Sequence, residues 1–271
     1  MTPKIIIEKT KFINRSDFDA VFGHIATPVL ISRDLSPYAL FMPRDKKYRT
    51  GSLAVAPVEI DGEIVGSLNQ WDPRPDRFEP DMDTTSLEQL MVKISLCLSN
   101  VAAHEKLKRF AFHDPLTGLP NRRAFETALN REFSRAKRHS QNLSLVFLDL
   151  DNFKQINDRH GHDAGDDALI YVADTLQSIV REEDMVARFA GDEFVIILPE
   201  TSTGKSEKLM HRIQQFLKRH PLNYKDIQIH ISLSYGITAA SDPDIDNPSE
   251  LLKKSDERLY AEKERERRRA G

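Results

Sequence analysis

The sequence contains one cysteine, one tryptophan and no long apolar run, and these scarcities exclude several classes of protein. A lone Cys97 cannot form an internal disulfide, so we expect a reducing compartment such as the cytoplasm. No stretch approaches the roughly 20 apolar residues that cross a bilayer, so we expect no transmembrane helix. The opening segment MTPKIIIEKTKF interrupts its short apolar triplet with charges, which argues against a signal peptide.

An excess of either charge is also lacking. The 39 Lys and Arg residues nearly balance 42 Asp and Glu residues, and the net charge is -3. This balance disfavours a nucleic-acid-binding protein that depends on overall positive charge. Apolar residues make up 39% of the chain and include 14 Phe, which excludes disorder throughout. A length of 271 residues suggests about two domains.

Periodicity and turn chemistry divide the chain into residues 1–84, 85–110 and 111–271. In the first part, Asp61-Gly62 lies between two alternating apolar runs, which predicts a hairpin. Residues 85–110 carry apolar side chains at three- and four-residue steps, which predicts a long helix. Its apolar seam suits either a coiled-coil-like connector or a terminal helix packed on the first domain.

The last part alternates helical and extended patterns. Asn121 is a candidate helix N-cap, and LSLVFLDLD indicates a buried strand that ends in acids. MVARF and FVIILP, joined by AGDE, predict a hairpin, and IQIHISLSYGIT predicts one further strand. The expected order is helix, strand, two helices, hairpin, helix, strand and helix, an α/β sandwich with a mixed sheet.

Acidic side chains cluster at two of these predicted elements. Asp149 and Asp151 end the buried strand, and Asp192 and Glu193 lie at the hairpin tip. If the hairpin pairs beside the strand, three or four carboxylates converge, and such a cluster needs a cation. Hard oxygen ligands favour Mg²⁺ or Mn²⁺ and metal-assisted phosphoryl or nucleotidyl transfer. The alternative is that these acids are solvated strand ends and turn formers.

Several motifs extend this hypothesis. The run LDLDNFKQINDRHGHDAGD resembles the nucleotide-binding stretch of the GGDEF family, the diguanylate cyclases. DPLTGLPNRRAF, RFAGDEFVIILPET, SLSYGIT and LLKKSDERLYAEK resemble further family motifs in the same order. The resemblance covers about 160 residues and implies a palm-like, nucleotidyl-cyclase-like sandwich.

The resemblance implies a role for each matching position. Asp149, Asp192 and Glu193 correspond to metal-binding acids, with Asp192 and Glu193 also catalytic. The other positions imply contacts to GTP. Asn152 and Phe153 correspond to triphosphate contacts, and Asn157 and Asp166 to guanine contacts. Lys263 and Arg267 correspond to a further pair that contacts phosphate.

The implied reaction joins two GTP molecules into cyclic di-GMP and releases two pyrophosphates. Because one domain holds one GTP, a homodimer with two-fold symmetry is expected. Arg181 and Asp184 match the family's RxxD inhibitory motif, and Arg212 lies where a second arginine assists in some members. A plain surface charge cluster is the alternative for this motif. Guanidinium groups suit guanine edges and phosphates, so the resemblance implies product inhibition.

The sequence departs from the family pattern in two places. Ala190 stands where the family usually has Gly, and it would be strained if that position needs a positive φ angle. The last helix continues as EKERERRR without the family's glycine, which affects the role of Arg267. We therefore expect a working enzyme, and keep as alternatives a non-enzymatic receptor for GTP or cyclic di-GMP and a domain that uses another nucleotide.

The first part of the chain has a weaker resemblance. The segment from Gly51 to Leu90 is similar to the second half of a GAF-like domain, on the strength of its hairpin and the DRFEPDM segment. The resemblance implies a small α+β domain over residues 1–84 that acts in sensing or dimerisation.

Overall fold

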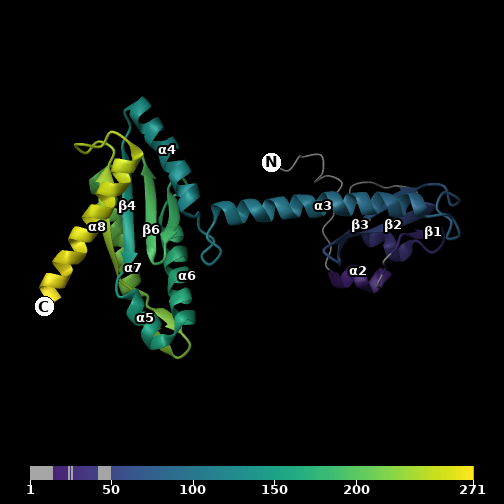
Figure 1. Ribbon diagram of the computed structural model, residues 1–271. Helices are drawn as coiled ribbons and strands as arrows, with labels where there is room; N and C mark the ends of the chain where they lie inside the picture. The colour runs from purple at the N-terminus through teal and green to yellow at the C-terminus, as the bar shows by residue number, and fades with distance from the viewer. Residues whose placement is uncertain (1–14, 24, 26, 42–49, 271) are drawn as a thin grey trace. The chain divides into compact units, whose positions relative to one another are not determined.

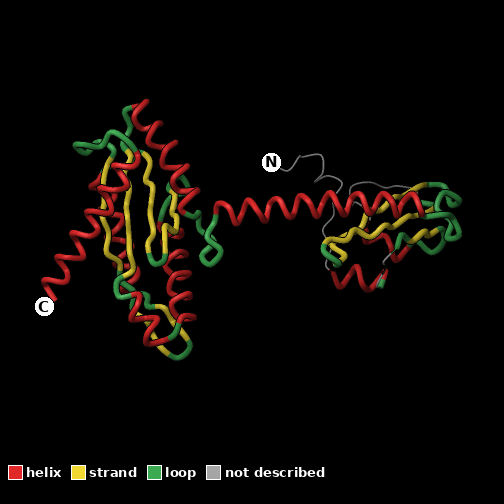
Figure 2. The backbone as a smooth tube through the Cα atoms, in the orientation of Figure 1, coloured by secondary structure: helices red, strands yellow, loops and turns green. Residues whose placement is uncertain are grey.

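The computed structural model describes residues 15–23, 25, 27–41 and 50–270 of the chain. The chain divides into two compact units, Met1–Lys106 and Leu107–Gly271. Figures 1 and 2 show both units, and each is treated by itself below. None of the described helices is both long and apolar enough to cross a membrane.

The first unit contains a small antiparallel sheet with strand order β1-β2-β3. Asp61 and Gly62 join β2 to β3 with φ angles of 52° and 83°, the two positive values of a type I′ turn. The predicted hairpin is therefore confirmed. The elements are α2 (Arg15–Phe22), β1 (Val29–Ile31), the 3-10 helix η1 (Ser36–Phe41), β2 (Ser52–Ile60) and β3 (Glu63–Asp72).

The long helix predicted after the first part is α3 (Thr85–Phe112). Met91 is buried against Ala56 and Val58, and Ile94 packs on the same cluster. Beyond this segment the helix exposes large apolar side chains: Leu96, Leu98, Val101, Leu107, Phe110 and Phe112. The first half is thus a packed terminal helix, and the second half exposes apolar side chains on more than one face.

The second unit is a four-stranded sheet with order β5-β6-β4-β9 between helices (Figure 2). Its elements are α4 (Arg122–His139), β4 (Leu143–Leu150), α5 (Phe153–His160), α6 (His162–Ile179), β5 (Met185–Ala190), β6 (Glu193–Pro199), α7 (Thr203–Arg219), β7 (Leu222–Tyr224), β8 (Ile227–Ile229), β9 (Leu233–Ala239) and α8 (Pro248–Ala270). Asn121 Oδ1 accepts the Ala124 N–H at 3.1 Å, so the predicted N-cap is confirmed.

Two details of the predicted sandwich are corrected. Every pairing in the four-stranded sheet is antiparallel rather than mixed, and the parallel contact is an isolated bridge from Asn121 to Arg188. The single strand expected over IQIHISLSYGIT is two strands, because β8 turns back through Lys225 to pair with β7. The α/β sandwich itself and the order of its main helices and strands are confirmed.

The central strand β4 separates two apolar layers because alternate side chains point to opposite faces. Leu145 and Phe147 pack with the α4 and α8 side, whereas Val146 and Leu148 pack with the α6 and α7 side. Asp149 continues the first set, so its carboxylate belongs to the face that α8 covers.

Candidate active site

The acids predicted to converge lie together at the end of β4. Asp149 is directly opposite Glu193 in the β4–β6 register. The N–H of Leu150 donates to the Asp192 carbonyl at 3.3 Å, which holds the hairpin tip beside the end of β4. The sheet pairing therefore brings Asp149, Asp192 and Glu193 to one point, although they are up to 44 residues apart in sequence.

Lys263 of α8 neutralises part of this cluster. Its Nζ lies 2.5 Å from Asp149 Oδ1, and both side chains are largely buried. The helix comes this close because β9 has a glycine beneath it. A Cβ on Gly236 would lie 2.1 Å from the Ser255 carbonyl oxygen. The missing side chain is what allows α8 to carry Lys263 to the acids.

Two acids of this cluster have raised pKa values because they are partly buried and lie near other carboxylates. Burial raises the pKa of Asp149, and the nearby Asp192 adds to the rise, while the hydrogen bond from Lys263 opposes it. Burial also raises the pKa of Glu193, helped by Asp149 and by Asp256 of α8. One lysine faces several carboxylates, so the cluster keeps an excess of negative charge.

This donor set fits a divalent cation that arrives with a nucleotide. Carboxylate oxygens suit Mg²⁺ or Mn²⁺, which commonly takes one or two carboxylates and completes its shell with substrate phosphates and water. Among the described residues, no three His, Cys, Asp or Glu side chains are arranged to hold a metal by themselves. Asp149 is paired with Lys263 instead, so the protein supplies only part of a coordination shell.

The predicted triphosphate contacts lie at the start of α5, which follows β4 after a two-residue turn. Asn152 adopts a left-handed conformation with φ 56°, and its carbonyl accepts the Gln155 N–H at 2.8 Å. This geometry opens the helix at Phe153. The first N–H groups of a helix have no partner within it, and they favour anionic groups such as phosphates.

The two predicted guanine readers lie on neighbouring helices. Asn157 is in the last turn of α5 and half-buried, whereas Asp166 is exposed in the second turn of α6. A Cβ on Gly165 would lie 2.0 Å from Asn157 Oδ1, so the Asn157 amide lies against the backbone next to Asp166. The structure thus brings these two positions together.

Arg267 pairs with a residue of its own helix, whereas Lys263 pairs with Asp149. Arg267 forms an ion pair with Glu264 of its own helix at 3.3 Å, and its side chain is 74% exposed. The phosphate role of Arg267 stays a prediction.

The predicted inhibitory motif forms a compact turn between α6 and β5. The Arg181 N–H donates to Asp184 Oδ2 at 3.0 Å, and burial raises the pKa of Asp184. Arg212 of α7 donates from Nη2 to the Ile179 carbonyl at 2.8 Å. The contact places Arg212 beside the chain segment that leads into Arg181.

The hairpin that carries Asp192 turns through Gly191, which has φ 48°. Ala190 is not among the described residues with positive φ, so the strain considered from the sequence does not arise. Ala190 lies at the end of β5 and is exposed. The departure from the family glycine is compatible with the backbone of the hairpin.

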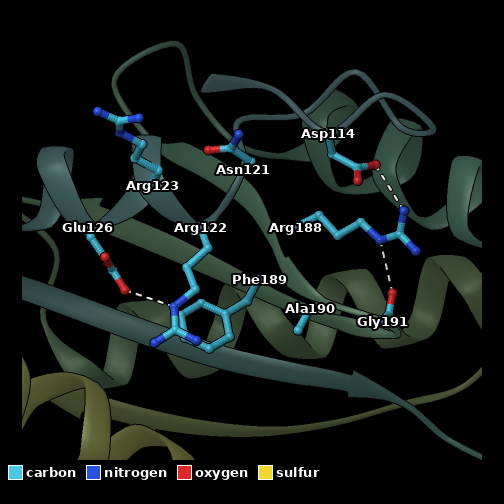
Figure 3. Close-up of a pocket in the computed structure, with 9 residues that line it drawn as sticks. All are labelled: Asp114, Asn121, Arg122, Arg123, Glu126, Arg188, Phe189, Ala190 and Gly191. Carbon is cyan, nitrogen blue, oxygen red and sulfur yellow. Dashed lines mark hydrogen bonds and ion pairs between the residues drawn. The ribbon is translucent and has the colours of Figure 1, made fainter. Parts of the chain in front are cut away.

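A partly buried ion pair that the sequence alone did not single out supports this hairpin. Arg188 Nη1 lies 2.9 Å from Asp114 Oδ1, and Arg188 Nε donates to the Gly191 carbonyl at 2.9 Å (Figure 3). Burial alone would raise the pKa of Asp114, but hydrogen bonds from Thr117 and Arg188 outweigh it and lower the pKa. In the sequence, Asp114 and Arg188 are marked only by their places in the motifs DPLTGLPNRRAF and RFAGDEFVIILPET.

Comparison with known proteins agrees with this geometry. Residues 111–269 match the family described as diguanylate cyclase, GGDEF domain. The diguanylate cyclase DgcP of Pseudomonas aeruginosa is 33% identical over 210 residues, which cover 75% of this chain and 31% of that protein. The probable diguanylate cyclase DgcC of Escherichia coli K12 is 35% identical over 172 residues, covering 63% of this chain and 46% of that protein.

Solved structures show the same fold. The coiled coil and GGDEF domain of DgcB from Caulobacter crescentus, in complex with c-di-GMP, matches with a TM-score of 0.58 and 27% identity. That match covers 66% of this chain and 95% of the other. The GGDEF domain of PA1120 (TpbB or YfiN) from Pseudomonas aeruginosa matches with a TM-score of 0.54 and 37% identity, covering 56% of this chain and 89% of the other.

The chain spans about a third of DgcP and under half of DgcC. The family match covers more than half of the chain, and it contains the acids, the α5–α6 pair and the hairpin described above. The chain therefore belongs to the GGDEF-domain family of diguanylate cyclases.

Proposed function

We propose that this protein is a diguanylate cyclase that condenses two GTP molecules into cyclic di-GMP with release of two pyrophosphates. The observation that supports this most directly is the meeting of Asp149, Asp192 and Glu193 beside Lys263. Crowded acids with one ammonium form a centre for a divalent cation and a polyphosphate, and the domain belongs to a family named for this activity.

Each GTP is held by one copy of the domain. The start of α5 at Asn152 and Phe153 contacts the triphosphate, and Lys263 and Arg267 contact phosphate oxygens. Asn157 and Asp166 pair with the guanine edge. A carboxylate accepts both N–H donors of that edge, and adenine presents a different pattern, so GTP is selected over ATP.

The chemistry forms two new phosphodiester bonds. In each, the 3′-oxygen of one GTP bonds to the α-phosphorus of the other, the bond to the pyrophosphate oxygen breaks, and the hydroxyl proton leaves. Asp149, Asp192 and Glu193, together with the substrate phosphates, would hold Mg²⁺ or Mn²⁺, and the ion would supply charge stabilisation to the phosphates. Glu193, whose pKa is raised by burial and by Asp149, is the carboxylate that we assign to accept the proton.

The reaction needs two copies, and α3 offers a surface for pairing. Its second half exposes several large apolar side chains, Leu96, Val101, Leu107 and Phe110 among them. Several large exposed apolar side chains on one helix are typical of an interaction site. We assign residues 1–84 to sensing or dimerisation in a GAF-like domain, 85–110 to the connector and 111–271 to the catalytic domain.

Product inhibition is assigned to the turn between α6 and β5. Arg181 and Asp184 form that turn, and Arg212 reaches its edge. Two guanidinium groups and a carboxylate suit the guanine edges and phosphates of cyclic di-GMP.

Ala190 decides between an enzyme and a receptor. The receptor alternative depends on a hairpin that alanine damages, yet Ala190 has no positive φ, and Gly191 takes the left-handed position. We therefore favour the enzyme.

The direct test is to incubate the purified chain with GTP and Mg²⁺ or Mn²⁺ over a range of protein concentrations, then separate the nucleotides by chromatography. Cyclic di-GMP is expected, with a specific activity that rises with protein concentration. Binding of cyclic di-GMP by calorimetry, together with no turnover at any concentration, would instead establish the receptor. A loss of guanine preference in Asp166→Ala is expected, and unchanged preference would indicate another nucleotide.

A further inference from the structure

Two adjoining pockets lie on the α4 side of the hairpin and share Arg122, Glu126 and Phe189. The first extends to Ala190 and Gly191 at the hairpin tip (Figure 3). The second extends between α4 and α8 to Glu193. We call the combined depression the α4 groove. It connects the acid assigned as proton acceptor to the hairpin tip.

Arg122 occupies the middle of the α4 groove on a rigid support. Its guanidinium lies 4.5 Å above the ring centroid of Phe189 (Figure 3). The Phe189 ring in turn contacts Phe125 and Phe147, with centroids 5.9 and 5.0 Å away. Because those rings are anchored in the core, the guanidinium has a defined platform.

The present partner of Arg122 is weak enough to be replaced. Arg122 Nε lies 2.8 Å from Glu126 Oε1 across one helical turn, and the two side chains are 60% and 47% exposed. Exposed pairs of this kind contribute little to stability. A phosphate, which accepts two parallel N–H bonds from a guanidinium, competes well with such a carboxylate.

The neighbouring arginines are placed differently. Arg188 is engaged by Asp114 and by the Gly191 carbonyl, and its side chain is 15% exposed. The guanidinium of Arg123 lies over the Phe112 ring and points away from Arg122 in Figure 3. Arg122 is therefore the arginine whose guanidinium faces the stretch from the hairpin tip to Glu193.

Helices α5 and α6, which carry the triphosphate and guanine contacts assigned to the resident GTP, lie on the other side of the sheet from this stretch, whereas Lys263 and Arg267 lie on α8. Ile156 of α5 and Leu169 of α6 pack with the sheet face opposite to that of α4 and α8. The attacking 3′-hydroxyl must reach the α-phosphate at the acids from a side that the resident GTP does not fill. Glu193, which must receive its proton, lines the α4 groove.

We propose that Arg122 binds a phosphate of the second GTP, the nucleotide that a second copy of this chain presents to the acids. The inference rests on the proposed function and extends it, since it assigns a substrate contact made across the pair. Phe189 supports the guanidinium, and Glu126 holds it in place until the nucleotide arrives.

The test uses the full chain and α,β-methylene-GTP, an analogue that cannot be cleaved at the attacked bond. Self-association is measured by sedimentation with Mg²⁺, with and without the analogue. Binding of the analogue is measured by calorimetry at a protein concentration where the chain is a monomer. The variants are Arg122→Ala and Arg122→Lys, with Arg131→Ala as the matched control. Arg131 is exposed on the same helix and pairs with its neighbour Glu132.

We expect the analogue to promote pairing of the wild type and of Arg131→Ala but not of Arg122→Ala. Monomer binding should stay within twofold in all of them, and cyclic di-GMP formation by Arg122→Ala should fall at least about tenfold, with partial rescue by lysine. The proposal is overturned if the analogue pairs Arg122→Ala as well as wild type, fails to pair the wild type, or loses monomer binding in Arg122→Ala. A wild type that pairs through Arg122 but makes no cyclic di-GMP would reject the proposed activity alone.

Discussion

At the level of single residues, the charge around Asp149 controls what the site can hold. The Lys263 ammonium satisfies one carboxylate, while burial and neighbouring acids raise the pKa values of Asp149 and Glu193. A group whose pKa is raised on folding destabilises the folded state above its usual pKa, and the penalty disappears below it. The site is thus built at a cost in stability that a cation relieves.

This cost predicts the effect of Glu193→Gln. Without metal and at neutral pH, the variant should melt about 1–3 °C higher than wild type, because a crowded charge is removed. The gain should disappear as the pH falls below the ordinary glutamate pKa of 4.5, where wild-type Glu193 is protonated in both states. Thermal melts in EDTA across pH measure it, with exposed Glu207→Gln as control. A gain that persists in acid would contradict the explanation.

Lys263→Met tests whether the Lys263 ammonium contacts a phosphate of GTP. The variant should raise the KM for GTP by about tenfold, because a charged phosphate contact is lost. Steady-state rates at fixed Mg²⁺ measure this effect. Lys254→Met is a matched control on the same helix, where the lysine pairs with Glu257 instead. Equal KM values in the two variants would show that Lys263 does not contact GTP.

Ala190→Gly should change little. Because Ala190 has no positive φ, the glycine relieves no strain, and the rate should stay within about threefold. Added chain entropy should lower stability by about 0.5–1 kcal/mol, measured by urea unfolding. A large gain in turnover would show that the methyl group crowds the phosphate.

At the level of elements, the site depends on how closely α8 packs on β9. Gly236 is the contact point, since a Cβ there would lie 2.1 Å from the Ser255 carbonyl and 2.4 Å from the Leu259 nitrogen. The Ser255 hydroxyl donates to the Leu251 carbonyl at 2.9 Å and is buried. Backbone atoms cannot yield as side chains do, so the helix must move if this position gains a side chain.

Gly236→Ala should therefore lower stability by about 1–3 kcal/mol and lower activity by moving Lys263 away from Asp149. Urea unfolding and GTP turnover measure the two effects. The control is Gly204→Ala in the first turn of α7, where a Cβ meets nothing within 4 Å. That variant should be neutral or more stable by about 0.4–1 kcal/mol. Similar losses in both variants would contradict the packing argument.

At the level of the whole molecule, the proposed reaction requires two copies of the chain. The second half of α3 has exposed apolar side chains, and its first half packs on the sheet of the first unit. The same helix therefore belongs to the first unit at one end and carries an apolar surface at the other.

Val101→Glu should weaken pairing, because Val101 is 60% exposed in that apolar stretch. Sedimentation should show a dimer dissociation constant about tenfold higher or more, and activity should recover at higher protein concentration. Ala102→Glu is the control, since it adds the same charge about 100° around the helix, on the face that carries Ser99, Lys106 and Arg109. Equal effects of the two variants would place the pairing surface elsewhere.

The sequence by itself determined the local elements and the identity of the candidate site. Apolar periodicity located α3, β4 and the β5–β6 hairpin, and the Asp61-Gly62 and Asn121 signals marked a turn and a cap, because such patterns act over a few residues. Motifs named the acids and the guanine readers. Two predictions were wrong, the mixed sheet and the single strand over IQIHISLSYGIT. Strand direction and the split between β8 and β9 depend on partners elsewhere in the chain, which a local pattern does not encode.

Only the tertiary structure decided which distant groups meet. Lys263 lies beside Asp149 because α8 crosses β9 at a glycine, and Arg188 pairs with Asp114 across 74 residues. The position of Arg122 between the hairpin tip and Glu193 likewise follows from the packing of α4 on Phe189. Contacts of this kind depend on packing and charge between elements, and no pattern within one element encodes them.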